Sequence, residues 1–313
     1  MAESNRGGDQ PLALSRPLPF PGVDRQTAVD APWPRTEEVT TWPPGHYYSP
    51  IPDLVEVRRR HAELFTDVPT SLPGIDLNLD AQLELAGRLA PFMTDLPFSD
   101  DAVRGLRYRF TNDFFGRSDG LVLYGMLRLH RPTTYVEIGS GWSSALVLDT
   151  RDLFLDHELS CIFVEPEPER LESLLREGDE RSTRIFRQPV QEVWRDVLAE
   201  ISEGDFLFID SSHVAKVGSD VMIELLEMVP RLPPGVHVQL HDIFYPFQYP
   251  APWVYDGRYW NEAYLLRALL THNSRLSITW WNHCLFTLRQ DPVAAILPGW
   301  ERGAGGSIWL RTG

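Results

Sequence analysis

The chain has 313 residues, of which 43% are hydrophobic, enough for one large domain with additions or for two domains. Asp and Glu number 44 against 29 Lys and Arg, so the formal net charge is −15 at pH 7. A surface this acidic repels phosphate backbones and anionic lipid, which argues against nucleic acid or a membrane surface as a partner.

Cysteine usage and hydrophobicity indicate the cytoplasm. Cys161 and Cys284 are too few for a disulfide framework, and Cys161 lies in an apolar, strand-like run, so both fit a reducing compartment. No signal peptide opens the chain, and no apolar run approaches the length of a membrane span. We therefore expect a soluble, cytoplasmic protein, with homo-oligomerisation left open.

The first part of the chain predicts a tail followed by a helical region. Residues 1–45 hold recurring prolines between small and polar residues, which is typical of a disordered tail or of a strap over the folded body. Helices are predicted after Asp53, which can cap the first one, and over 78–92, where apolar residues recur at helical spacing. Residues 46–130 are thus expected to form a helical cap or lid region.

An unusual segment at 108–119 combines aromatic rings, an amide and charges, just before an apolar helix predicted at 120–130. Two interpretations remain open. In one, the rings anchor a cap helix to the core. In the other, the segment is a lid over the glycine turn that follows.

The chain is organised around residues 133–144. Aromatic and β-branched residues at 135–138 predict a buried strand, which breaks at Gly139-Ser140-Gly141 before an apolar helix from 143 to about 153. Strand, glycine turn and helix are the geometry in which a nucleotide-like ligand lies against open backbone N–H groups. Gly139 and Gly141 permit the positive φ angles and the close backbone approach that this requires.

Two polar residues qualify that pattern. The third glycine of the dinucleotide fingerprint is replaced by Ser144, which argues against a nicotinamide site. Glu137 lies inside the strand, where a carboxylate is costly unless it has a partner. We interpret Glu137 as a ligand contact rather than as a residue that only caps the turn.

Downstream of the turn, strands and helices alternate, which predicts a parallel sheet covered on both faces. The expected strands are 160–165, 184–187, 206–210 and 236–240, and the expected helices are 168–176, 190–201, 219–229 and 261–270. Two final strands, 276–281 and 307–311, show no crossover helix between them. We therefore expect them to pair antiparallel at the edge of the sheet.

Polar residues gather where these strands end, and in an open parallel sheet that is where ligands bind. Glu165 closes the second strand and is placed to accept hydrogen bonds from two ribose hydroxyls. Asn261 and Glu262, at a later helix start, are either a cap or lie near an acceptor. The remaining candidates follow the turn and strands four and five: Ser140, Asp210, Ser211, Ser212, His213, His241 and Asp242.

Several of these runs carry a family resemblance over roughly residues 108–313. Val136-Glu137-Ile138-Gly139-Ser140-Gly141 resembles motif I of the class I S-adenosylmethionine-dependent methyltransferases, and Glu165 matches the acidic residue after their second strand. The runs at 208–213 and 239–243 are similar to the Ile-Asp-x-x-His and His-Asp-Ile signatures of a bacterial branch of that family.

The resemblance implies a Rossmann-like α/β fold with helices on both faces of a seven-stranded, mostly parallel sheet of order 3-2-1-4-5-7-6. It makes residues 131–313 the methyltransferase domain, and it implies S-adenosylmethionine as the cofactor. The residues that it assigns to the cofactor are Glu137, Gly139, Ser140, Gly141, Glu165 and Asp210.

Methyl transfer from a sulfonium requires an aligned acceptor and removal of its proton. His213 or His241 is the expected base, because histidine titrates near neutral pH. Alternatively, His213 is a structural residue bonded to Asp220 in the next helix. Asp210 and Asp242 complete the predicted catalytic set.

A metal is the alternative way to activate the acceptor. Related O-methyltransferases hold Mg²⁺ with carboxylates at the ends of strands four and five, which makes Asp210 and Asp242 the candidate ligands. Ile243 stands where a third oxygen ligand is expected. The sequence therefore does not favour a metal.

The loop at 243–260 is rich in aromatic residues, which either suit a sugar ring at the mouth of a site or only pack the loop onto the sheet. The leading interpretation is a methyltransferase acting at oxygen on a sugar, a glycoside or another small-molecule acceptor. One alternative is a nicotinamide-dependent oxidoreductase, disfavoured by Ser144 and by the edge strands. Another is a non-catalytic subunit that keeps the cofactor fold, against which the retained Glu137, Glu165, Asp210 and His213 argue.

Overall fold

The computed structural model describes residues 41–313. The chain divides into two compact units, between Val55 and Glu56. In the described part of the first unit, Asp53 accepts a hydrogen bond of 2.8 Å from the Val55 backbone nitrogen at the start of α1 (Leu54–Arg59), so it caps this helix as predicted. Apart from residues 41–45, the tail expected at 1–45 lies outside the described residues.

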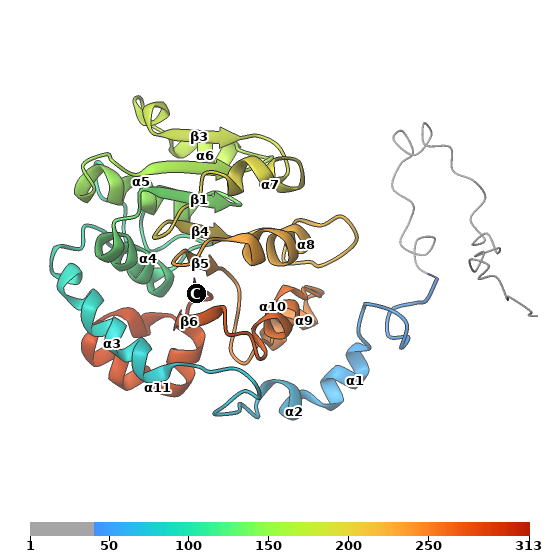
Figure 1. Cartoon of the computed structure of the whole chain (residues 1–313). Coiled ribbons are helices and arrows are strands. Elements are labelled where there is room, and N and C mark those ends of the chain that lie inside the picture. Colours follow the sequence, from blue (N-terminus) through green and yellow to red (C-terminus); the bar gives the residue numbers. More distant parts are fainter. Residues whose placement is uncertain (1–40) are drawn as a thin grey trace, which may run out of the picture. The chain divides into compact units, whose positions relative to one another are not determined.

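The unit from Glu56 onward is built on one sheet of seven strands (Figure 1). The order β3-β2-β1-β4-β5-β7-β6 confirms the order that the resemblance implied. β1 to β5 pair parallel, whereas β7 is antiparallel to both β5 and β6. The strands are β1 (Thr134–Ile138), β2 (Ser160–Val164), β3 (Thr183–Phe186), β4 (Phe206–Ile209), β5 (His237–Leu240), β6 (Leu276–Trp281) and β7 (Ile308–Thr312).

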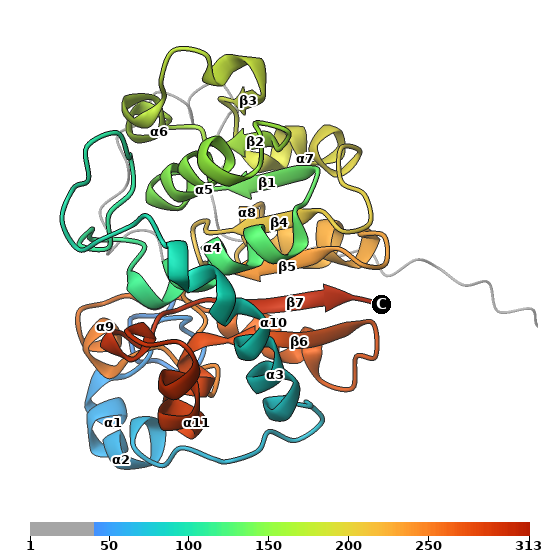
Figure 2. The same ribbon diagram turned by 90° about the vertical axis from the view of Figure 1, so that its left-hand side faces the viewer.

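Helices cover both faces of the sheet (Figures 1 and 2). α4 (Arg117–His130) and α5 (Trp142–Phe154) pack together on one face, and α7 (Val190–Leu198), α8 (Asp220–Ile223) and α10 (Glu262–Leu270) lie on the other. Because both faces are covered, β4 is an apolar run buried along its whole length. The shorter elements are α6 (Glu169–Leu174), η3 (Asp179–Arg181), and a π-helical turn η4 (Glu224–Met228) and a 3-10 turn η5 (Val229–Arg231) that continue α8.

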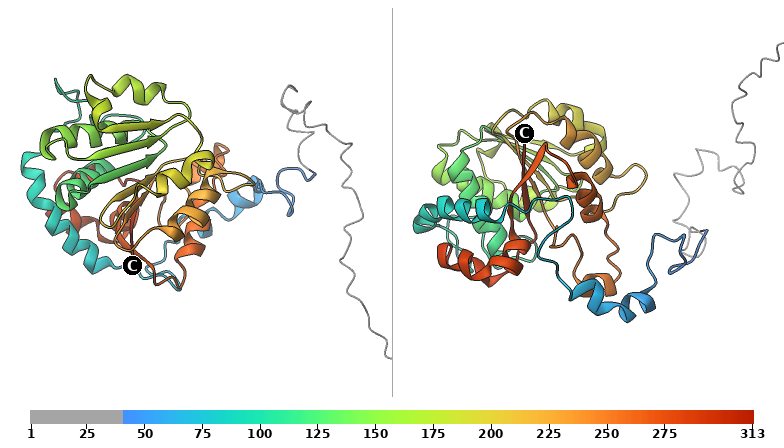
Figure 3. Two further views of the ribbon diagram at one scale, coloured as in Figure 1. Left: turned by 45° about the horizontal axis from the view of Figure 1, so that its top comes forward. Right: turned by 60° about the horizontal axis from the view of Figure 1, so that its bottom comes forward.

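The connection between β6 and β7 differs from the expectation. The two strands pair antiparallel as predicted, but α11 (Asn282–Ile296) and the 3-10 turn η6 (Trp300–Arg302) lie between them, so the expected absence of a helix is wrong. Pro292 and the non-helical backbone of Arg289 interrupt α11, which obscures its period in the sequence. α11 packs beside α3 (Leu79–Leu89), as Figure 3 shows.

Of the helices that precede the sheet, α3 and α4 contribute residues to its hydrophobic core. α3 continues into the 3-10 turn η2 (Ala90–Asp95), and both contact α4. α2 (His61–Phe65) and α9 (Ala251–Tyr255) are joined by a hydrogen bond of 2.8 Å between His61 Nδ1 and the Tyr255 hydroxyl. Within residues 41–313, none of the helices is both long and apolar enough to cross a membrane.

Candidate active site

The glycine turn between β1 and α5 brings the backbone against the end of β4. Gly139 has a φ of +81°, and a Cβ built on it would lie 1.8 Å from the carbonyl oxygen of Asp210, so only glycine fits there. Gly141 has an extended φ of 177° and would meet only the Arg170 side chain, at 3.2 Å. Ser144 accepts a hydrogen bond of 2.9 Å from the Gly141 nitrogen, which fixes the turn.

A cleft of about 500 Å³ opens beside this turn, and Gly139, Glu165 and Asp210 are among the residues that line it. Glu165 accepts hydrogen bonds of 2.9 Å from the backbone nitrogens of Ser140 and Glu167, one on each carboxylate oxygen. Each of these oxygens keeps a further lone pair. Glu165 can therefore still accept hydrogen bonds from a ligand in the cleft.

Glu137 is fully buried beneath the turn. Ser143 of α5 donates a hydrogen bond from its hydroxyl to this carboxyl group, and burial raises the pKa of Glu137 to about 8. The cleft is lined by the neighbouring Ile138 and Gly139 rather than by Glu137. A buried carboxyl group requires a polar partner, and Ser143 is that partner here. This hydrogen bond joins β1 to α5.

Asp210, His213, His241 and Asp242 form one cluster where β4 and β5 end. His213 Nε2 lies 3.4 Å from Asp210 Oδ1 and 3.7 Å from Asp242 Oδ2. His241 Nδ1 lies 3.6 Å from Asp210 Oδ1 and 3.5 Å from Asp242 Oδ1. His213 and Asp242 also have positive φ angles of 60° and 56°, and such strained backbone is concentrated at functional sites. The structure thus brings the four predicted catalytic residues together.

A buried carboxylate on α10 orients His213. Glu262 Oε2 lies 2.8 Å from His213 Nδ1, and the Glu262 side chain is only 1% exposed. The alternative that His213 bonds to Asp220 is wrong, because Asp220 accepts hydrogen bonds from the backbone nitrogen and the hydroxyl of Ser212 instead. Sequence reasoning placed Glu262 near the acceptor or as a cap but gave it no partner.

A second buried carboxylate, Asp119 of α4, faces His241 and was missed by sequence reasoning. Its Oδ2 lies 3.6 Å from His241 Nε2. Asp119 Oδ1 also accepts hydrogen bonds from the Asn282 amide (2.6 Å) and from the Ser307 backbone nitrogen (2.8 Å). The signal was an acid in the first turn of an otherwise apolar helix, but its partners are far away in the chain.

These contacts change the protonation of the cluster. Burial alone would lower the pKa of His213, but Asp210 and Glu262 raise it to about 10. The pKa of His241 is also raised despite burial, by Asp242 and Asp210. Against the effect of burial, the charge of His241 keeps the pKa of Asp210 low, whereas burial keeps that of Asp242 high. The cluster therefore attracts cations, either protons on its histidines or a metal ion in their place.

The aromatic segment at 108–119 is anchored in the core. Tyr108, Phe110 and Phe115 are buried, whereas Phe114 is 54% exposed. The Phe115 ring lies 5.4 Å from the His241 ring, centroid to centroid. The anchoring interpretation is thus confirmed for these three rings, and Phe115 borders the cluster of predicted catalytic residues.

The aromatic loop after β5 divides into packed and half-buried rings. Tyr245, Phe247 and Tyr249 are buried, which confirms the packing interpretation for them. Trp253 and Trp260 are half-buried and lie 5.3 Å apart, and the Trp260 ring lies 4.3 Å from the His213 ring. Trp260 therefore lies beside the cluster of predicted catalytic residues, with Trp253 next to it.

Comparison with known proteins agrees with this geometry. A family model described as a methyltransferase domain matches residues 136–243, which run from β1 to just past Asp242. An uncharacterised protein of Archaeoglobus fulgidus is 33% identical over 157 residues, which cover 49% of this chain and 70% of that protein. The chain belongs to the class I S-adenosylmethionine-dependent methyltransferases.

Solved structures similar to this methyltransferase are more distant. The O-methyltransferase TomG of Streptomyces achromogenes, in complex with SAM, is 17% identical, with 74% of this chain and 89% of that chain covered and a TM-score of 0.40. SAH-bound methyltransferase PaMTH1 of Podospora anserina is 14% identical, with 83% and 96% covered and a TM-score of 0.39. These similarities are too low to transfer an acceptor or a site residue.

Part of the cluster of predicted catalytic residues fits a divalent cation. Asp210, His241 and Asp242 each offer one ligand atom, and the three atoms lie within 4.8 Å of one another. His241 could therefore provide the third ligand that the sequence lacks at Ile243. A mixed set of carboxylate oxygens and imidazole nitrogen suits manganese, iron or zinc better than magnesium. A carboxylate behind a ligating histidine is the usual support for such a site, and Asp119 occupies that place.

Proposed function

We propose that this enzyme binds S-adenosylmethionine in the cleft beside the glycine turn and transfers its methyl group to an oxygen atom of a small-molecule acceptor. One observation carries the proposal. Asp210 lines the cleft, and its backbone carbonyl packs against Gly139. Its side chain contacts both His213 and His241. Cofactor and catalytic cluster therefore share a residue, as transfer over a short distance requires.

The cofactor contacts follow from the residues that line or adjoin the cleft. Glu165 would accept hydrogen bonds from the ribose hydroxyls with its remaining lone pairs. Gly139, Ser140 and Gly141 would let the backbone approach the amino-acid part of the cofactor, and Asp210 would lie near its sulfonium end. Glu137 would act from beneath, by holding the turn in place through Ser143.

The acceptor proton is best taken by a carboxylate. His213 is held in its protonated form by Asp210 and Glu262, so it is a poor base when no metal is bound. Asp242 has a raised pKa and is only partly buried, so we assign it the acceptor proton. His213 and His241 would keep Asp210 and Asp242 in position and balance their negative charge. A divalent cation bound to Asp210, His241 and Asp242 would lower the pKa of the acceptor hydroxyl.

A sugar, a glycoside or another flat amphipathic molecule is the acceptor that the surroundings suit best. Phe244, Trp253 and Trp260 are half-buried, the Trp253 ring contacts the other two, and Trp260 also contacts His213. Aromatic faces of this kind stack on the apolar face of a sugar ring. The exposed Phe114, held under Arg170, would serve as part of a lid on the opposite side of the turn.

Turnover with labelled S-adenosylmethionine and a panel of hydroxylated acceptors, read by mass spectrometry, tests the proposal. Asp242→Asn should lower kcat by roughly 10²–10⁴-fold while calorimetric affinity for S-adenosylhomocysteine stays within a few-fold. Asp196→Asn, an exposed change on α7, is the control and should leave both unchanged. Full turnover by Asp242→Asn would overturn the assignment. Tight binding of NAD in place of S-adenosylhomocysteine would overturn the assignment of S-adenosylmethionine as the cofactor.

A further inference from the structure

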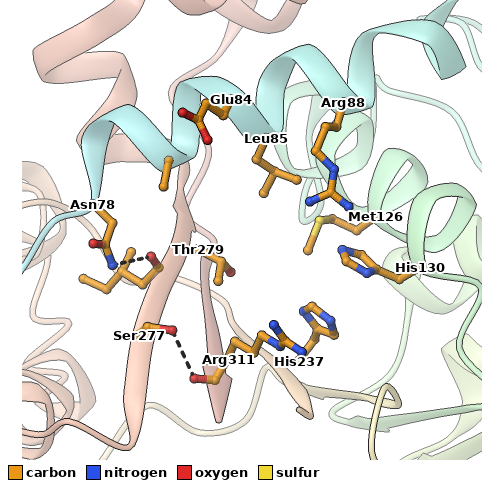
Figure 4. A pocket seen from close by; sticks show the side chains of 12 residues that line it. Asn78, Glu84, Leu85, Arg88, Met126, His130, His237, Ser277, Thr279 and Arg311 are labelled. Carbon is orange, nitrogen blue, oxygen red and sulfur yellow. Dashed lines mark hydrogen bonds between the residues drawn. The ribbon is translucent and has the colours of Figure 1, made fainter. Parts of the chain in front are cut away.

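A second cavity lies at the opposite end of β5 from His241 and Asp242. It has a volume of about 350 Å³ and is lined by residues of α3, the end of α4 and the strands β5 to β7 (Figure 4). His237 opens β5, whereas His241 follows the end of that strand. In the antiparallel register, Arg311 of β7 lies directly opposite His237. The cavity is therefore separate from the cofactor cleft.

Positive charge converges on one end of this cavity, away from the carboxylate of Glu84 in its lining. Arg88 of α3 points into it from one side and Arg311 from the other, and the His130 and His237 rings lie between them (Figure 4). In the part of the chain that the structure describes, no ion pair or side-chain hydrogen bond engages the guanidinium of either arginine. Both arginines are exposed, so their guanidinium groups are accessible to a ligand from solvent.

The positive charge of the two arginines contributes to lowering the pKa values of His130 and His237. Their rings are 4.2 Å apart, centroid to centroid, and His237 is 5% exposed. Burial, together with Arg88 and Arg311, lowers the pKa of His130 to about 4. Burial, His130 and the same arginines lower the pKa of His237 to about 3. Both imidazoles are thus neutral at physiological pH, and each keeps one N–H that can donate to an anion.

The rest of the wall is suited to an organic body. Leu85, Met126 and Ile278 provide apolar surface next to the cationic end. Glu84, the acidic residue of the lining, lies toward the other end of the cavity from Arg88 in Figure 4 and forms no ion pair with it. The cavity therefore has a cationic end, an apolar middle and a polar end at Asn78 and Ser277.

We propose that this cavity is a binding site for a small organic anion, whose carboxylate or phosphate group is held between Arg88 and Arg311 while its apolar body lies on Leu85 and Met126. Guanidinium groups bind both kinds of oxyanion through paired, charge-assisted hydrogen bonds. A volume of about 350 Å³ is that of a site for a small molecule. The inference does not depend on the proposed acceptor or cofactor.

Calorimetry and imidazole NMR on the full-length protein, saturated with S-adenosylhomocysteine to close the cofactor cleft, test the site. The probes are phenyl phosphate, benzoate, inorganic phosphate and phenol. We expect phenyl phosphate or benzoate to bind with saturation and to shift the His130 and His237 resonances, while exposed His157 does not move. Phenyl phosphate and benzoate separate a phosphate from a carboxylate ligand. If inorganic phosphate binds as tightly as phenyl phosphate, the claim that an apolar body of the ligand lies on Leu85 and Met126 is overturned.

Substitutions at the two arginines complete the test. Arg88→Gln and Arg311→Gln should each weaken the preferred probe about tenfold or more, because each removes a charged hydrogen-bond donor. Arg181→Gln, at an exposed arginine elsewhere, is the control and should bind as the wild type does. Circular dichroism checks folding, and either arginine variant suffices if the other fails to fold. The proposal is overturned if no anion shifts the two histidines, or if phenol binds as well as phenyl phosphate.

Discussion

Gly139→Ala should damage the methyltransferase more than any other single methyl added at the turn. An alanine at a φ of +81° costs about 1–2 kcal/mol from its own backbone. Its Cβ would lie 1.8 Å from the Asp210 carbonyl oxygen, so β1 and β4 must separate at this end. That movement loosens the hydrogen bond of 2.9 Å from the Asp210 nitrogen to the Ile138 carbonyl, worth about 1 kcal/mol. The expected loss of unfolding free energy is about 2–3 kcal/mol.

Urea unfolding and calorimetry with S-adenosylhomocysteine measure this effect, with Gly141→Ala as the matched control. At Gly141 the φ is extended and the new methyl meets only the movable Arg170 side chain, so stability should change by less than about 1 kcal/mol. For a domain of this size, a loss of about 2–3 kcal/mol lowers the Tm by roughly 4–12 °C. Equal stability of the two variants would refute the argument, because it would show that the approach of β1 to β4 at Gly139 is not constrained.

Four further outcomes are expected. Glu165→Ala should weaken S-adenosylhomocysteine binding by on the order of 1–3 kcal/mol. Glu167→Ala, in the same cleft, should leave that affinity unchanged. Equal losses of affinity in the two variants by calorimetry would contradict the assignment of Glu165 to the ribose. Burial raises the pKa of Glu137 to about 8, so its ionisation opposes folding as pH rises from about 4.5 to 8; the urea-unfolding difference between Glu137→Gln and wild type should grow over that window in favour of the variant. The pKa of His237 is lowered to about 3, so this residue should make stability fall as pH drops below about 6.5, by about 2 kcal/mol at pH 5; His237→Gln should remove that share of the slope and leave the share due to His130, whose pKa is lowered to about 4. Treatment with EDTA should reduce turnover, and Mn²⁺ should restore it better than Mg²⁺; undiminished turnover after chelation would exclude a metal role for Asp242.

The alternating core of the fold was predictable because its signals are local. Strand β1, the turn at 139–141 and helix α5 follow one another within a short stretch, and each has its own residue pattern. The later strands are short apolar runs bounded by polar residues, so their positions could be predicted to within one or two residues. α11 was missed because Pro292 breaks the period that defines a helix in the sequence.

The candidate site was predictable only in part, for the same reason. Asp210, His213, His241 and Asp242 stand directly after strands, and the ends of neighbouring parallel strands must meet. The partners of these residues could not be predicted in the same way. The sequence offered Asp220 for His213, because Asp220 is near in the chain, whereas the structure pairs His213 with Glu262.

The sequence by itself therefore determined the sheet, the glycine turn and the residues at the carboxyl ends of β4 and β5, because those depend on local periodicity and on the direction of parallel strands. Only the tertiary structure decided which buried acids face the histidines. Asp119 reaches His241 from α4, and Glu262 reaches His213 from α10. It likewise decided that Arg88 and Arg311 share a cavity. Such contacts join helices and strands far apart in the chain, and their energies depend on burial and distance, neither of which a linear pattern contains.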